Sequence, residues 1–368
     1  MVVADHTPMM LAAASRYCWG TGSYPDPSGQ RSRLVPAVVA LQAGVAHTQD
    51  DASPPVVIAC SDATLPPLLE AGATAGLGPM CVPEAAAYHR LSDKWTLFQL
   101  ARELGVPTPD TWLARAGSAC AADIASGSSA VAVKPRASVL DVGGIRRKLP
   151  VLLLPRSALP DLLAGDTYPA GAELLVQTLV PGDGVGVSAL CAAGQAVRWF
   201  AHRRLREKPP SGGVSTLCES IALPPEVRDY CERLIAAVRW HGPVMFEFKW
   251  TPAGAWSLIE VNGRLWGSIQ LCIDCGVDLP LAMYRLARGE TVAADDRYIV
   301  GRRLRWLMGD LGYLYLVLRG RSVDPRHPSR VAALGNFLSA RPGSTAIEDW
   351  RYGDWRPFTR QVAAEFGR

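Results

Sequence analysis

Two glutamates and an asparagine in the second half of the chain have residue types and spacing that could hold a divalent cation. They fall in residues 244–250 and 255–264, which alternate apolar and polar side chains around a short Thr-Pro-Ala-Gly segment and so predict a β-hairpin. Alternation places Glu260 and Asn262 on one face, and a turn centred on the Ala-Gly pair places Glu247 opposite Glu260. The opposite face, expected in the core, carries Phe246, Phe248 and Trp250.

Two carboxylates that face each other repel unless a positive charge neutralises them. A divalent cation would do so, and two carboxylates with an amide oxygen are hard ligands, which suit Mg²⁺ held against nucleotide phosphates better than zinc. The alternative is that both glutamates lie on a solvated sheet face and pair with Lys249 and Arg264. The residue types alone leave both interpretations open.

A second stretch, residues 201–215, concentrates cations and ends in glycine. It includes Arg203, Arg204 and the pair Gly212-Gly213, whose backbone amides could approach an anion closely. This pattern is typical of a clamp for an anionic substrate. The alternative is an exposed basic hairpin, because Arg and Lys are usually solvated. His202, which stands alone, is expected to be structural.

The composition indicates a globular chain with two or three lobes, since its 368 residues are 49% hydrophobic and 20% charged. The apolar runs are far shorter than the roughly 20 residues that span a bilayer, and no basic region precedes the short apolar stretch near the N-terminus. We therefore expect a cytoplasmic protein with no membrane partner. The net charge of +4 comes with no long basic tract interleaved with aromatic residues, so no nucleic-acid partner is expected.

The nine cysteines are odd in number and scattered, which suits a reducing compartment better than a disulfide framework. The one close pair, Cys272-x-x-Cys275, has no second pair or nearby histidine to complete a zinc site. Because this pair lies in an apolar stretch expected to be helical, we interpret both residues as small core side chains.

The elements that must position these residues can be predicted from spacing. The first ninety residues indicate an α/β lobe without a G-x-G-x-x-G fingerprint. Ser92 is a suitable N-cap for a helix that ends at Gly105. The tail after Tyr298 is expected to be mostly helical. Further expected elements are a strand at 56–60, strands at 130–135, 174–177 and 185–192, and a helix at 227–240.

Five segments occur in the order found in ATP-grasp enzymes. Glu247 followed by Ile259-Glu260-Val-Asn262-Gly-Arg264 resembles the metal-binding end of that superfamily, particularly of carboxylate-amine ligases related to the carbamoyl-phosphate synthase large chain. The resemblance covers roughly residues 88 to 290, and its specificity comes from the order of the segments. The other four segments are Asp93-Lys94 with Glu103-Leu-Gly-Val-Pro-Thr-Pro109, Val133-Lys134-Pro135, Leu175-Val-Gln177-Thr-Leu-Val180, and Gly276-Val-Asp-Leu-Pro280 with Arg288-Gly-Glu290.

The resemblance implies an α/β and α+β chain with the ATP-grasp fold, in which two lobes enclose ATP between their sheets. The implied divisions are an N-terminal α/β domain at 1–88, an ATP-grasp domain at 89–298 with a small lobe at about 111–176 and a large lobe at about 177–298, and a mostly helical extension at 299–368.

The resemblance also implies nucleotide contacts. Lys94 and Lys134 would meet the phosphates. Many relatives have an acidic residue shortly after the adenine strand; this chain departs from them with Gly182-Asp183-Gly184, in which Asp183 would contact the ribose. The loop 136–148, with its glycines and basic residues, would either cover the phosphates or be an ordinary surface loop. The backbone expected at the adenine edge runs through Gln177, Thr178, Leu179 and Val180.

The implied reaction is ATP- and Mg²⁺-dependent activation of a carboxylate as an acyl phosphate, which an amine then converts to an amide. Glu247, Glu260 and Asn262 would hold one or two Mg²⁺ ions. Arg264 would stabilise the transferred phosphoryl group or the oxyanion and is a candidate catalytic residue.

The substrates implied by the resemblance are a small carboxylate and an amine. The carboxylate would lie against Arg204, a second candidate catalytic residue, with Arg203 and Gly212-Gly213 around it. Two other functions stay open: a carboxylation or carbamoyl-phosphate-type reaction with bicarbonate, and a nucleotide-binding subunit without catalysis. At the level of the family, the protein could also form a homodimer.

Overall fold

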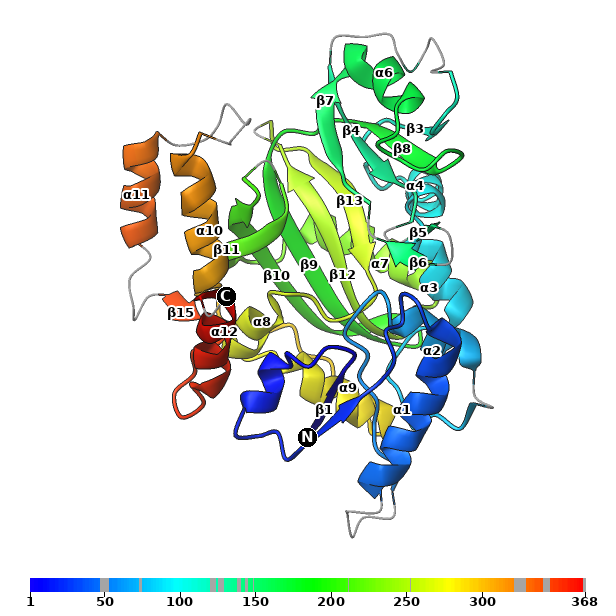
Figure 1. Cartoon of the computed structure of the whole chain (residues 1–368), viewed down its shortest axis with the longest axis vertical. Coiled ribbons are helices and arrows are strands. Elements are labelled where there is room, and N and C mark those ends of the chain that lie inside the picture. The colour runs from blue at the N-terminus through cyan, green and yellow to red at the C-terminus, as the bar shows by residue number, and fades with distance from the viewer. Residues whose placement is uncertain are drawn as a thin grey trace.

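The computed structural model describes residues 1–46, 53–72, 75–119, 124, 129–137, 140–142, 145–147, 149–210, 212–251, 253–320, 329–339 and 345–366. A large sheet forms the centre, a smaller sheet lies beyond one end of it, the N-terminal region packs near the other end, and C-terminal helices flank one edge (Figure 1). Gly143-Gly144 and Lys148, which belong to the expected phosphate-covering loop, lie outside the described residues.

The large sheet has the strand order β13-β12-β9-β10-β11-β14-β15 among the described residues. Neighbouring strands are antiparallel, except β14 and β15, which are parallel. One edge is therefore the hairpin with the candidate metal ligands, and the other edge comes from the C-terminal region. The strands are β9 (Asp183–Ala192), β10 (Gln195–Lys208), β11 (Val214–Ser220), β12 (Gly242–Trp250), β13 (Trp256–Asn262), β14 (Arg303–Arg305) and β15 (Thr345–Ile347).

The smaller sheet is antiparallel, in the order β3-β8-β4-β7. Its strands are β3 (Thr111–Arg115), β4 (Ala130–Pro135), β7 (Leu152–Pro155) and β8 (Glu173–Thr178). The segments η3 (Arg156–Ala158) and α6 (Leu159–Ala164) follow β7, and Leu159 and Leu163 join its core. Where the sequence indicated a loop, β5 (Leu140–Val142) and β6 (Ile145–Arg147) pair as a separate antiparallel hairpin.

Two cores lie on opposite faces of the large sheet. The first includes Phe246, Phe248 and side chains of α3 (Ala85–Ser92), α4 (Lys94–Glu103) and α7 (Pro225–Ala237). The second includes Phe200, Met245 and side chains of α8 (Ile269–Asp274) and α9 (Leu279–Ala287). Since side chains two residues apart share a face, His202, Arg204 and Glu247 continue the second face beyond its core. This continuation carries the candidate site.

Two helices differ from their predicted bounds. Ser92 ends α3, and the N-cap of α4 is Asp93, whose carboxylate accepts a hydrogen bond from the Thr96 backbone N–H at 2.9 Å. Serine and aspartate are both good N-caps, so sequence spacing alone could not show which of these two adjacent residues caps the helix. Helix α7 ends at Ala237, three residues early, because Arg239 adopts a positive φ of 49° that a right-handed helix does not allow.

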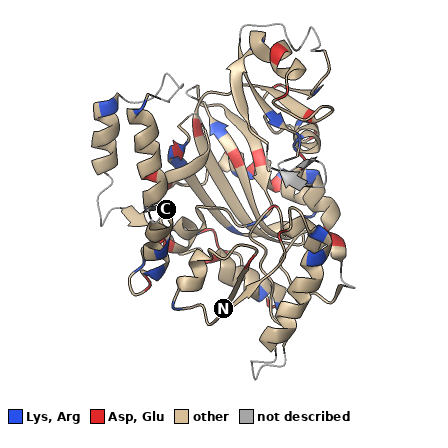
Figure 2. Cartoon of the chain, in the orientation of Figure 1, with Lys and Arg blue, Asp and Glu red and all other residues tan. Residues whose placement is uncertain are grey.

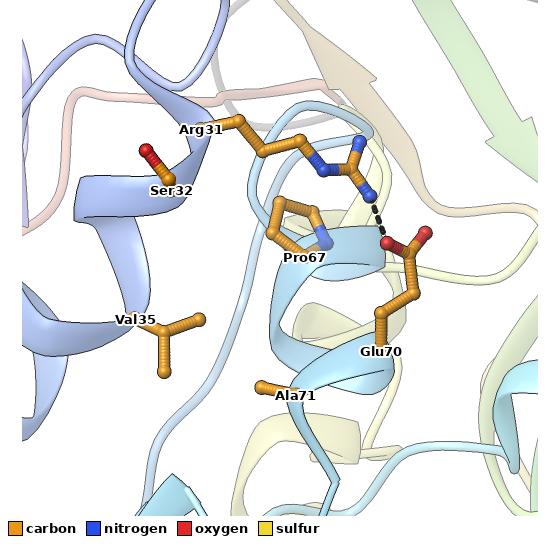
Figure 3. Close-up of a pocket in the computed structure, with 6 residues that line it drawn as sticks. All are labelled: Arg31, Ser32, Val35, Pro67, Glu70 and Ala71. Carbon is orange, nitrogen blue, oxygen red and sulfur yellow. Dashed lines mark hydrogen bonds and ion pairs between the residues drawn. The ribbon is translucent and has the colours of Figure 1, made fainter.

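The N-terminal region contains β1 (Val2–Asp5) and β2 (Gly20–Ser23), which pair in parallel, η1 (Leu11–Ala14), α1 (Arg31–Ala46) and α2 (Leu65–Ala71). The strand predicted at 56–60 is wrong, since this segment joins no described sheet. Val57 donates to the carbonyl of Pro79 at 3.0 Å, but proline has no N–H to return a bond and extend a ladder. Arg31 reaches from α1 to Glu70 on α2 across a surface hollow (Figure 3).

The C-terminal region is mostly helical, as predicted, and it also supplies two strands of the large sheet. Its helices are α10 (Leu307–Leu318), α11 (Arg330–Ser339) and α12 (Arg356–Phe366). Asp310 of α10 is fully buried and accepts hydrogen bonds from Arg206 and Arg305, which fixes α10 to β10 and β14. In the part of the chain that the structure describes, no helix has the length and apolar character needed to cross a membrane.

Candidate functional site

The β12–β13 hairpin has the predicted register. Glu247 pairs with Glu260, and Met245 pairs with Asn262. A β-bulge follows Glu247 and locally changes the stagger of the strands. The asparagine amide donates to Glu247 Oε1 at 3.1 Å, so the three candidate metal ligands form one group.

The core face of this hairpin is confirmed in part. Phe246 and Phe248 are buried, as predicted. Trp250 is 45% exposed, so its prediction as a core residue is wrong. It lies at the end of β12, where it stacks on Trp256 with ring centroids 5.8 Å apart instead of entering the core.

Two buried lysines from different elements approach Glu260. Lys94 begins α4, and its Nζ lies 3.1 Å from Glu260 Oε1. Lys134 lies near the end of β4 in the smaller sheet, and its Nζ donates to the Ile259 carbonyl at 3.2 Å. Helix α4 and the smaller sheet therefore each place a lysine against β13. These are the two lysines for which the family resemblance implies phosphate contacts.

The pKa values of these groups depend on one another. Burial alone would raise the pKa of Glu260, but the charges of Lys94 and Lys134 outweigh it and lower the pKa to about 2. Burial lowers the pKa of Lys134 to about 8, against the opposing effect of Glu260. At neutral pH, Glu260 is therefore ionised, and Lys134 carries a positive charge that is costly to desolvate.

Arg204 supplies a further positive charge, from β10. Its Nη2 lies 2.7 Å from Glu247 Oε1, and its Nη1 donates to Glu207 Oε1 at 2.9 Å. Gly184 makes room for this side chain, because a Cβ there would lie 3.0 Å from Arg204 Cδ. Figure 2 shows acidic and basic residues close together on the central strands of the large sheet. The charges of Glu247 and Glu207 raise the pKa of Arg204 despite burial.

Arg264 contacts a residue that the sequence analysis did not consider. Its Nη2 donates to Asp62 Oδ2 at 2.8 Å, and its Nη1 donates to the Leu265 carbonyl at 3.0 Å. Burial lowers the pKa of Arg264, but the bond to Asp62 and the charges of Glu260 and Glu247 give a net increase. Asp62 is 202 residues away along the chain, so no local spacing could have indicated this contact.

His202 lies beside the same group, directly opposite Gly186 in the sheet register. A Cβ on Gly186 would lie 2.3 Å from the imidazole Cε1, so glycine is needed beneath the ring. The imidazole Nε2 is 3.1 Å from Ser268 Oγ, and burial lowers its pKa to about 3. A neutral, buried ring fits the expected structural role.

The segment predicted to meet adenine lies on β8 and just after it. Gln177 is buried, and its side-chain amide donates to Thr111 Oγ1 at 2.8 Å. The amides of Thr178 and Leu179 donate to the carbonyls of Asp110 and Ala130, each at 3.0 Å. An adenine edge bound here would therefore use carbonyl oxygens or the Val180 amide. Asp183 lies at the exposed start of β9.

The remaining predicted substrate contacts lie apart from this group or present a different atom. Arg203 points to the face opposite Arg204 and pairs with Glu219 of β11. Gly213 faces Arg204 with its carbonyl oxygen, at 3.5 Å, and not with an amide. Gly212 has a φ of 124°, which suits the turn between β10 and β11. Across the described residues, no cluster of three His, Cys, Asp or Glu side chains forms a metal site, so the candidate set depends on Asn262.

Cys272 and Cys275 are buried in the second core of the large sheet, as expected, and both thiols are free. Cys272 lies within α8, and Cys275 is the residue that ends it.

Comparison with solved structures identifies the fold. Biotin carboxylase from Campylobacter jejuni, in its beta-gamma-ATP complex, has a TM-score of 0.60 with 16% identity over 82% of this chain and 68% of that chain. The biotin carboxylase domain dimer of the Hydrogenobacter thermophilus 2-oxoglutarate carboxylase, complexed with MgADP, ADP and bicarbonate, has a TM-score of 0.59 with 15% identity over 82% and 67%. L-amino acid ligase from Bacillus licheniformis has a TM-score of 0.53 with 14% identity over 78% and 73%.

The chain therefore has the ATP-grasp fold, as the order of its sequence segments predicted. Within that class, residues 171–308 match the model of a family described as ATP-grasp in the biosynthetic pathway with Ter operon. No curated protein matches the sequence. The matched residues include β9 to β13 and all the candidate metal ligands, whereas Lys94, Lys134 and Asp62 lie outside them.

Proposed function

We propose that the protein is an ATP- and Mg²⁺-dependent carboxylate-amine ligase. The observation that carries the proposal is the opposed pair Glu247 and Glu260, which form ion pairs with Arg204 of β10 and Lys94 of α4. Like charges placed opposite each other destabilise a sheet unless something neutralises them. Their placement at one site, with partly exposed side chains, supports a role in binding charged ligands.

The donor set suits magnesium. Glu247, Glu260 and Asn262 offer carboxylate and amide oxygens from adjacent strands, which are hard ligands of the kind Mg²⁺ prefers. When bound, the ion would neutralise negative charge on the phosphates. Lys94 and Arg204 already place positive charge against these carboxylates, which supports a site built around the balance of several charges.

In this proposal, ATP lies between the two sheets. Lys94 and Lys134 hold its phosphates, and Asp183 contacts the ribose. The proposed domains are 1–88, 89–298 and 299–368, with the lobes of the central domain divided near residue 176. We further propose a cytoplasmic location and a homodimer; the neighbour from Hydrogenobacter thermophilus is itself described as a dimer.

The proposed chemistry has two steps. An oxygen of the substrate carboxylate attacks the γ-phosphorus, and ADP leaves with the electron pair of the broken P–O bond. The ammonium form of the amine first loses one proton to solvent. Its nitrogen then attacks the carbonyl carbon, phosphate leaves with the electron pair of the C–O bond, and the nitrogen passes its second proton to the departing phosphate. Arg204 and Arg264 would stabilise the negative charge that develops on oxygen.

The test is release of ADP and phosphate from Mg²⁺-ATP with pooled carboxylic acids, with and without pooled amines, and separately with bicarbonate. We expect turnover to require both pools and to be lost in Glu260→Gln, while Glu232→Gln, an exposed carboxylate on α7, keeps full activity. Turnover with bicarbonate alone would favour the carboxylation alternative. Failure of ATP to bind at all would contradict the proposed site.

A further inference from the structure

Asp62 and Arg264 join the N-terminal region to the candidate site. The contact is between a loop that precedes α2 and the residue two positions after the end of β13. The side chains are 33% and 22% exposed, so both charged groups remain accessible to a small ligand. The N-terminal region therefore contributes a carboxylate to the place where Arg264 would meet the transferred phosphoryl group.

The loop that carries Asp62 is well braced. Ser61 Oγ accepts a hydrogen bond from the Thr64 backbone N–H at 3.2 Å, and the Ser61 and Thr64 hydroxyls are 2.9 Å apart. Leu65 to Leu68, which begin α2 directly afterwards, are buried. A carboxylate held by a hydrogen-bonded and anchored turn loses little conformational entropy when it binds a ligand.

The carboxylates around the site have different partners. Glu247 contacts Arg204, and Glu260 contacts Lys94, and both are candidate metal ligands. Asp62 comes from a different part of the chain, and its partner Arg264 is the proposed phosphoryl or oxyanion contact. If Arg264 turns toward developing negative charge during the reaction, Asp62 needs another cation as its partner.

We propose that Asp62 binds the ammonium group of the acceptor amine. The inference rests on the proposed ligase function and adds a substrate class to it. An aliphatic amine or the α-amino group of an amino acid is protonated at neutral pH, so a carboxylate beside the acyl phosphate would attract and position it. When both substrates are bound, Arg264 faces the acyl phosphate and Asp62 faces the ammonium group, so each charged side chain has an oppositely charged partner. The ammonium group then loses one proton to solvent, which frees the nitrogen lone pair for attack, and the remaining N–H groups can still donate to Asp62.

The proposal predicts a preference for nucleophiles that carry a positive charge when they bind. Hydroxylamine is largely uncharged at neutral pH and reacts with acyl phosphates to give hydroxamates, so it reports formation of the acyl phosphate without needing an ammonium contact. Comparing amide formation with hydroxamate formation therefore isolates the role of Asp62.

The experiment measures both products for the full chain, with Mg²⁺-ATP and a pool of carboxylic acids that carry no amino group. Each reaction receives either hydroxylamine or a pool of aliphatic amines and amino acids. For Asp62→Asn we expect the ratio of amide to hydroxamate to fall about tenfold or more relative to the unmodified chain, because one partner of a charge pair is lost. Glu70→Gln, which removes a carboxylate paired with an arginine elsewhere in the N-terminal region, should leave the ratio unchanged.

Asp62→Glu, which keeps the charge, should restore the ratio at least in part, and it serves as the second variant if Asp62→Asn does not fold. Equal loss of both products in Asp62→Asn would overturn the proposal, because it would mean that Asp62 only orients Arg264. An unchanged ratio would overturn it as well. If the unmodified chain binds Mg²⁺-ATP but gives neither product, the ligase function fails, and this inference fails with it.

Discussion

Two clusters of acidic and basic residues lie on the large sheet, and they differ in what surrounds them. The closed cluster consists of Asp310 with Arg206, Arg305 and Thr216, and its carboxylate is 0% exposed. The site cluster consists of Glu247, Glu260 and Asn262 with Lys94, Lys134 and Arg204. Glu260 in the site cluster is 32% exposed.

The difference lies in how the charges are satisfied. In the closed cluster, one carboxylate accepts three bonds of 2.6 Å from two arginines and a longer one from Thr216, so its geometry is complete. In the site cluster, two carboxylates face each other across a ladder and cations from separate elements surround them. We propose that the completely paired, buried cluster serves stability, whereas the opposed like charges at the accessible place serve ligand binding.

Replacing the buried carboxylate should have the largest effect on stability. Asp310→Ala leaves Arg206 and Arg305 without their shared carboxylate partner, and breaking a buried ion pair in this way costs about 3 to 5 kcal/mol. Urea denaturation followed by circular dichroism would measure the change in the free energy of unfolding. A loss below about 1 kcal/mol would show that the closed cluster is not a structural anchor.

The site cluster should respond in the opposite way. Glu247→Gln removes one of two opposed like charges, so the free energy of unfolding should change by no more than about 1 kcal/mol, because Arg204 keeps Glu207 as a partner. Turnover should fall on the order of 10²- to 10³-fold, as a ligand of the proposed metal site is lost. Parallel measurements of denaturation and of ADP release would test both parts. A variant that is strongly destabilised but active would reverse the roles assigned to the two clusters.

Adjacent arginines on β10 offer a sharper version of this comparison. Arg204 contacts Glu247 on the site face, while Arg203 points the other way and pairs with Glu219. Arg204→Ala should lower kcat/KM about tenfold to 10²-fold. Arg203→Ala should stay within about threefold, since exposed ion pairs contribute little. Steady-state kinetics on both variants would measure these changes. Similar losses of kcat/KM would mean that positive charge on β10 contributes regardless of which face of the sheet carries it.

The site hairpin could be predicted because its register depends on residues that are close together in the sequence. Alternation and a short turn determine the register of Glu247 and Glu260, and one strand face must be apolar to enter the core. The burial of Trp250 was predicted wrongly, because alternation assigns a side chain to a sheet face but does not show whether the core extends to that end of the strand. The choice between Ser92 and Asp93 as the N-cap failed for a similar reason, since adjacent good caps differ only in tertiary context.

Contacts between distant segments could not be predicted in the same way. The contact of Asp62 with Arg264 and those of Arg206 and Arg305 with Asp310 each depend on how sheets and helices pack. The order of family segments partly substitutes for this missing information, because it implies which lobes face each other. It implied that Lys94 and Lys134 lie near one site, but it could not indicate Asp62, which precedes the resembling segments.

The smallest predicted effect concerns pH dependence beside the closed cluster. Glu348 follows β15, its backbone N–H donates to the Arg305 carbonyl at 2.9 Å, and burial raises its pKa from 4.5 to about 7, with Asp349 adding to the increase. Since the folded state binds this proton more tightly than the unfolded state, the stability linked to Glu348 is present below about pH 4.5 and is lost as pH rises through about 7. Relative to the unmodified chain, Glu348→Gln should therefore gain roughly 1 kcal/mol in the free energy of unfolding between pH 5 and pH 8. The gain is this small because the carboxyl group is partly exposed and solvent screens its charge. Urea denaturation across that range would measure it, and two parallel pH profiles would mean that Glu348 titrates as an ordinary surface carboxyl and that the closed cluster is insensitive to the charge beside it.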